Sequence, residues 1–174
     1  MAPIKHGGND RQKIKSIGLK VINLVSAMLF VSITLVVVIC VLMFYRLTMS
    51  MMQNECVSAT NVLARELSTY DTGDEDKTEL LDALKKEMGC EFTIFEGDVR
   101  TYTTILQNGR RAVGTRLSSD IADIVLKQGQ SYTGKANILG STHLCSYAPT
   151  YDANGQVNGL LFAGISMYAA LKEM

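Results

Sequence analysis

The stretch FTIFEGDVRTYTTILQNGRRAVGT, residues 92 to 115, has the pattern of a β-hairpin with an unusual number of polar side chains. It holds three arginines, five threonines and one tyrosine. A strand requires only alternating apolar residues, so Arg100, Arg110 and Arg111 need another explanation. Guanidinium groups bind a carboxylate through two parallel hydrogen bonds, and Thr and Tyr hydroxyls can fill its remaining lone pairs. The hairpin is therefore suited to hold a small anion.

Side chains alternate along a strand, so we expect Arg100, Tyr102 and Thr104 to share the face that forms the pocket wall. The GRRAVGT loop adds Arg111 and Thr115, while Gly114 leaves backbone N–H groups that can approach a ligand. The alternative is that the arginines form exposed ion pairs and the threonines serve only as strand formers.

The sequence around this hairpin alternates short helices with strands. An amphipathic helix over residues 74 to 89 precedes it, and a second helix over 118 to 129 follows it. Three more strands follow over residues 130 to 139, 142 to 149 and 157 to 165, and Ser166 caps a last helix. Five mainly antiparallel strands with helices to one side predict a compact α+β domain. Tyr132 and Tyr147 lie in the later strands, where each is predicted to line the pocket or to pack in the core.

Residues 21 to 45 carry no charge over 25 consecutive positions, which exceeds the roughly 20 residues that cross a bilayer as a helix. Five bases and one acid precede this segment, so the N-terminus is expected in the cytoplasm and the rest of the chain outside. A cleaved signal peptide is the alternative, but its apolar region would be shorter. The whole chain balances 17 basic against 17 acidic residues, and we expect no nucleic-acid partner.

No Pro or Gly interrupts residues 46 to 70, so the helix is expected to continue outward as a stalk that ends at DTGD, residues 71 to 74. A four-three spacing predicts the seam of a two-stranded coiled coil and hence a homodimer. The alternative is one helix packed on its own domain. Both interpretations hold if the lower half of the stalk pairs with a second copy and the upper half packs on its own domain. The predicted seam consists of Tyr45, Met49, Met52, Cys56, Ala59, Leu63, Glu66 and Tyr70.

Neither a catalytic nor a metal-binding motif is present in the sequence. His143 is the only histidine expected outside the membrane, and no GxSxG, HExxH or phosphate-binding loop accompanies it. The spacing of the four cysteines matches no zinc site. Cys90 and Cys145 would be bridged if their strands are neighbours, and Cys56 would cross-link a dimer; buried reduced thiols are the alternative. We expect no enzyme activity, cofactor or metal.

Several segments resemble a known family: IFEGDVRTYTTI, GRRAVGT, YTGKANILG and YAPTYDANGQVNGLLFAGI, followed by a closing helix. Their spacing is similar to that of the single Cache sensor domain, of the Cache_3 type, in bacterial methyl-accepting chemotaxis receptors and related transmembrane kinases. The resemblance covers about residues 46 to 170. It implies a PAS-like sheet that holds a small molecule under the segment between the second and third strands. In the family's motif Thr103 is the matching threonine, which makes it a secondary candidate.

The organisation that we expect follows from the segments together with this resemblance. It is a cytoplasmic basic tail (1 to 20), a transmembrane helix (21 to 45), a stalk (46 to 70), a single Cache domain (71 to 166) and a helix returning to the membrane (167 to 174). The chain is then expected to be the outward-facing sensor region of a membrane receptor, a chemotaxis receptor, for a small, anionic metabolite, and it is either a fragment or a single-pass protein. The alternatives are a histidine-kinase sensor and a membrane-anchored dimeric interaction module without a ligand.

Overall fold

The computed structural model describes residues 8–69 and 76–168, with side chains from residue 18 onward. The chain divides into two compact units, Met1–Thr48 and Met49–Met174. Helix α1 (Gly8–Thr69) belongs to both. Among the described residues, one helix, over Gly18–Thr69, is long and apolar enough to cross a membrane, with a hydropathy of 3.0 in its most apolar window. The predicted helix stop at residues 71 to 74 and the last helix beyond residue 168 lie outside the described residues.

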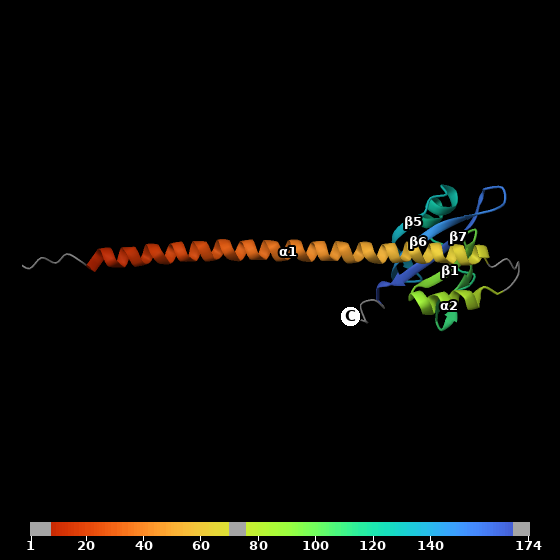
Figure 1. Cartoon of the computed structure of the whole chain (residues 1–174), viewed down its shortest axis with the longest axis horizontal. Helices are drawn as coiled ribbons and strands as arrows, with labels where there is room; N and C mark the ends of the chain where they lie inside the picture. Colours follow the sequence, from red (N-terminus) through yellow and green to blue (C-terminus); the bar gives the residue numbers. More distant parts are fainter. Residues whose placement is uncertain (1–7, 70–75, 169–174) are drawn as a thin grey trace, which may run out of the picture. The chain divides into compact units, whose positions relative to one another are not determined.

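The second unit contains a five-stranded antiparallel sheet in the order β2-β1-β7-β6-β5 (Figure 1). Its strands are β1 (Glu91–Glu96), β2 (Val99–Thr103), β5 (Tyr132–Ile138), β6 (Ser141–Tyr151) and β7 (Val157–Ser166). The predicted α+β fold is confirmed. The second predicted strand is shorter than expected, because the chain leaves the sheet after Thr103 and forms a separate hairpin of β3 (Leu106–Gln107) and β4 (Arg110–Arg111).

One face of the sheet is covered by α1 and by α2 (Thr78–Met88). Leu81 and Leu84 of α2 pack with Phe92 and Ile94 of β1, and Gly89 ends the helix at a φ of 68°. Only glycine adopts this left-handed conformation without steric cost, which is why α2 ends at the predicted cap.

The opposite face of the sheet is covered by the segment between β2 and β5. This segment includes α3 (Ser119–Ala122) and a π-helical turn, η1 (Asp123–Lys127). Ile121 and Val125 pack on Phe95 and Phe162 of the sheet. The expectation that all helices lie to one side is therefore wrong for this helix, because its apolar residues cover the second face. Strand β1 lies between β2 and β7 and is buried on both faces, so its four positions from Phe92 to Phe95 are all buried and burial does not alternate along it.

Part of the predicted coiled-coil seam is buried in its own domain. Cys56, Ala59 and Leu63 of α1 have no exposed surface, and the Cys56 thiol donates to the Leu144 carbonyl at 3.3 Å. At these three residues the structure shows the alternative, in which the helix packs on its own domain. A buried Cys56 is not positioned to cross-link a dimer.

The conjectured bridge between Cys90 and Cys145 is also wrong. β1 and β6 are not neighbours, since β7 lies between them. Cys90 packs in the cluster under α1 and α2, whereas Cys145 packs in the cluster on the opposite face and donates to the Gly134 carbonyl at 3.3 Å. Burial raises the pKa of each thiol from 9.0 to about 12, which keeps both protonated at neutral pH.

A pair of strand glycines tests this packing. A Cβ added at Gly159 would lie 2.2 Å from the Phe95 carbonyl oxygen, so β7 could not keep its distance from β1. At Gly134 the added atom would meet a side chain rather than backbone, namely Tyr132, with its hydroxyl oxygen at 2.8 Å and its Cζ at 3.1 Å. We expect Gly159→Ala to lower the free energy of unfolding by about 3 kcal/mol and Gly134→Ala to change it by less than about 1 kcal/mol. Urea unfolding of the full chain in detergent measures both. Equal losses in the two variants would contradict this register.

Candidate functional site

The side chain of Arg100 is turned into the domain by an irregularity in the hairpin. Phe95 of β1 pairs with Arg100, but Ile94 pairs with Tyr102, so Thr101 is an extra residue without a partner in β1. This β-bulge shifts the alternation of β2 by one residue. Arg100 and Thr103 therefore lie on the face that carries Phe95, and Tyr102 lies on the other. The expectation that Arg100 and Tyr102 share a face is wrong for this reason.

Arg100 is a buried cation with an incomplete set of partners. Its side chain is 4% exposed, its guanidinium carbon lies 5.0 Å from the centre of the Phe95 ring, and its Nη1 donates to the Thr115 hydroxyl at 2.5 Å. Its Nε is buried and has no hydrogen-bond partner among the described residues. Burial lowers the pKa of Arg100, because removing water disfavours the charged form. An anion beside this guanidinium would offset that cost.

Arg100 opens on a small cavity of about 140 Å³, which we call the Arg100 cavity. Its lining residues are Arg100, Arg116, Leu117, Ser118, Asn137, Ile138, Leu139 and Tyr147. An adjoining cavity of about 270 Å³ shares Ser118 and Asn137 with it and is also lined by Tyr132. Tyr147 lines the Arg100 cavity and Tyr132 lines the adjoining one, and the centres of their rings lie 6.2 Å apart. Burial raises the pKa of the Tyr147 phenol, which keeps it a neutral donor, whereas the positive charge of Arg100 acts in the opposite direction.

The structure brings four of the eight predicted residues to these cavities or to Arg100 itself: Arg100, Thr115, Tyr132 and Tyr147. Thr115 holds Arg100 in place, because its own hydroxyl donates to the Ala112 carbonyl at 2.8 Å. The Tyr132 hydroxyl donates to the Lys135 carbonyl at 2.9 Å and leaves the ring as the lining surface.

The other four predicted residues have partners within the protein. Tyr102 packs with the α2 cluster, with the Lys77 ammonium 5.9 Å from its ring centre. Thr103 bonds the Thr93 hydroxyl at 2.7 Å, and Thr104 donates to the Glu91 carboxylate at 2.5 Å. These three side chains are fixed by contacts that do not involve the Arg100 cavity.

Arg111 is directed away from the Arg100 cavity. It pairs with Asp82 of α2 at 2.6 Å and donates to the Thr103 carbonyl at 2.8 Å, so it ties the β3-β4 hairpin to α2. The expected free N–H of Gly114 donates to the Arg100 carbonyl at 2.8 Å and is not open to a ligand. Backbone hydrogen bonds from this loop therefore hold Arg100 in position.

Sequence reasoning missed Arg116, Ser118 and Asn137. Arg116 directly follows the predicted Thr115, yet it pairs with Asp98 at 2.7 Å and its side chain is 72% exposed, so it lies at the rim. Asn137 belongs to β5, where no pattern in the sequence separates a pocket residue from a surface residue. Leu139, in the β5-β6 turn, has a φ of 52°, a strained conformation for leucine.

Two solved structures are similar to this chain. The crystal structure of the E. coli DcuS sensor domain is 16% identical, covers 73% of this chain and 97% of its own, and has a TM-score of 0.52. This likeness concerns the fold. A sensory box sensor histidine kinase from Vibrio cholerae is 14% identical, with 62% and 96% of the two chains covered and a TM-score of 0.34. No curated protein matches the chain.

The resemblance inferred from the hairpin, the loop and the later strands is confirmed by the match to a protein family. The family described as single cache domain 3 matches residues 73–174, which include the whole sheet, both cavities and the buried Arg100. The chain belongs to the single cache domain 3 family.

Proposed function

We propose that this chain is the extracytoplasmic sensor region of a membrane receptor and that it binds a small anionic metabolite in the Arg100 cavity. The observation that carries the proposal is the buried guanidinium of Arg100, whose Nε lacks a hydrogen-bond partner among the described residues. An unpaired buried charge is costly, and a carboxylate on that guanidinium would offset the cost. The DcuS structure, described as a sensor domain, supports the same role through the shared fold. The proposal assigns no catalysis to the chain.

The anion would meet donors from two of the strands that line the cavity. Arg100 supplies the charge from β2, and Tyr147 supplies a phenolic hydroxyl from β6. The volume of about 140 Å³ is small, so a compact carboxylate fits better than a large ligand. The adjoining cavity that Tyr132 lines offers room for an uncharged extension of the ligand.

Strand β6 would carry the signal from the ligand to α1. Tyr147 faces the Arg100 cavity, while the carbonyls of its neighbours Leu144 and Ser146 accept hydrogen bonds from α1, from Cys56 at 3.3 Å and from Thr60 at 3.5 Å. A ligand shifts a conformational equilibrium only through different affinities for the two states. We infer that the bound state moves β6 and the turns around Leu139 against α1.

The receptor would act as a homodimer through α1. Because Cys56, Ala59 and Leu63 are buried, the pairing face outside the membrane would be the exposed stripe of Met51, Asn54, Ser58 and Asn61, which follows the same four-three spacing. Beyond Met51 the stripe carries polar side chains, of which Ser58 is small and allows two helices to approach closely.

Changing Arg100 tests the ligand site. We expect Arg100→Met to abolish the rise in melting temperature that small carboxylates produce in the full chain, with a loss of affinity of about 100-fold or more. The same variant should leave the ligand-free protein as stable as before or more stable, because an unpaired buried charge is removed. Differential scanning fluorimetry with a carboxylate panel gives both values. Arg110→Ala, an exposed arginine of the β3-β4 hairpin, is the matched control. A strong loss of ligand-free stability in Arg100→Met would make Arg100 a structural residue.

Cysteine cross-linking tests the dimer. In a chain with Cys40 replaced by Ala, Ser58→Cys should form a disulfide-linked dimer in membranes, since Ser58 lies on the exposed stripe of α1. Asn154→Cys, in the exposed turn between β6 and β7, is the control and should remain monomeric. Non-reducing electrophoresis after mild oxidation measures both. Equal cross-linking at the two positions, or none at Ser58, argues against this seam.

The output that we propose is chemotaxis, as the sequence resemblance favours, with a histidine kinase as the alternative. Cells without the protein should then lose the swimming response to the ligand found by fluorimetry. The wild-type receptor and its Arg110→Ala variant should restore the response, and Arg100→Met should not. If cells without the protein keep the swimming response but lose a ligand-induced change in transcription, the kinase is favoured.

A further inference from the structure

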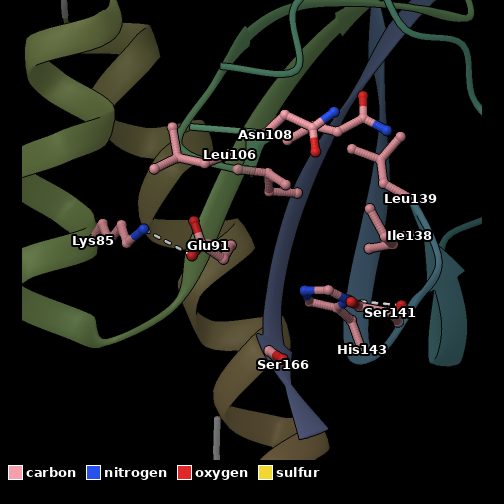
Figure 2. A pocket seen from close by; sticks show the side chains of 11 residues that line it. Lys85, Glu91, Leu106, Asn108, Ile138, Leu139, Ser141, His143 and Ser166 are labelled. Atoms are coloured by element: carbon pink, nitrogen blue, oxygen red, sulfur yellow. Dashed lines mark hydrogen bonds and ion pairs between the residues drawn. The ribbon is translucent and has the colours of Figure 1, made fainter. Parts of the chain in front are cut away.

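A larger cavity, of about 390 Å³, lies on the same face of the sheet as the Arg100 cavity but does not include Arg100. We call it the His143 cavity. It lies between the β3-β4 hairpin and the β5-β6 turn, at the end of the sheet where β7 finishes (Figure 2). Its polar lining includes Lys85, Glu91, Asn108, Ser141, His143 and Ser166. The two cavities share Ile138 and Leu139 as a common apolar wall.

His143 presents a hydrogen-bond acceptor to this cavity. Its side chain is 5% exposed, and its Nδ1 lies 3.0 Å from the Ser141 carbonyl oxygen. A carbonyl only accepts, so Nδ1 carries the proton, and the Nε2 of the neutral ring has a free lone pair. No hydrogen bond within the described part of the chain reaches Nε2. Figure 2 shows the ring directed toward the side of the cavity where Glu91 lies.

Glu91 presents a carboxylate whose positive partner is replaceable. Its Oε2 accepts from the Thr104 hydroxyl at 2.5 Å, which fixes the group in place, and its Oε1 lies 2.7 Å from the Lys85 ammonium. The Lys85 side chain is 40% exposed, whereas that of Glu91 is 24% exposed. An ion pair with a half-exposed lysine contributes little, because water screens it and the long side chain loses freedom. Another ammonium group can therefore replace Lys85 at low cost.

We propose that the His143 cavity binds a small primary ammonium ligand, which replaces Lys85 on Glu91 and donates to the Nε2 of His143. An ammonium group has three donors and no acceptor, so it satisfies a carboxylate and a lone pair together. A carboxylate ligand would instead face the charge of Glu91 and a second acceptor. This site is separate from the anion site at Arg100, and the inference does not depend on the proposed function.

Nitrogen NMR of the histidine ring tests the site directly. The chain has two histidines, so His6→Gln in the full chain, labelled with ¹⁵N-histidine, leaves only the signals of His143. At about pH 8, ethylammonium should shift the Nε2 resonance in a saturable manner, whereas acetate should not. A shift with acetate alone, or none with either probe, would overturn the proposal.

Three variants sharpen the result. Glu91→Gln keeps the shape but removes the charge, and it should weaken ethylammonium binding about 10-fold or more. Lys85→Met removes the competing ammonium and should strengthen ethylammonium binding about threefold or more. If Lys85 itself held the ligand, the same variant would lose binding. Arg100→Met should leave ethylammonium binding unchanged, which separates this site from the anion site. Weaker binding in Lys85→Met, or an unchanged affinity in Glu91→Gln, would contradict the proposed geometry.

Discussion

The β-bulge between β1 and β2 is the constraint on which the candidate site depends. Because Thr101 has no partner in β1, Arg100 turns to the face that carries Phe95, and Tyr102 turns to the face that α2 covers. The backbone of the following loop fixes this arrangement, since Arg100 exchanges hydrogen bonds with Thr115 and Gly114 at 2.9 and 2.8 Å. An uninterrupted hairpin of the same sequence would place Arg100 and Thr103 on opposite faces.

In our proposal, the buried guanidinium is also what lets a domain of this size respond to a small ligand. Most of the sheet face that carries Arg100 is closed by apolar packing of Ile121, Val125 and Phe162, which stabilises the fold. Arg100 is the exception, because burial lowers its pKa and its Nε lacks a partner among the described residues. The binding energy of an anion would be concentrated at this one residue, close to a strand that bonds α1.

The sequence predicted the elements better than the side-chain directions. The helix cap at Gly89, the five strands and the hairpin turns follow from local patterns, so they could be found without a structure. The face of Tyr102 could not, since a bulge leaves no signal in a Thr-rich strand. The seam of α1 was ambiguous for a physical reason: apolar residues at four-three spacing suit a partner helix and a sheet equally well, and the sheet covers Cys56, Ala59 and Leu63. Asn137 lies near Arg100 only through tertiary pairing.

The central claim is that the buried guanidinium of Arg100 is the charged partner of an anionic ligand. A crystal structure of the chain grown with a carboxylate that raises its melting temperature tests this claim most directly. Our account predicts ligand density in the Arg100 cavity, with a carboxylate oxygen within hydrogen-bond distance of the Arg100 Nε and near the Tyr147 hydroxyl. Density elsewhere, with Arg100 Nε paired to a group of the protein in the loaded state, would contradict it.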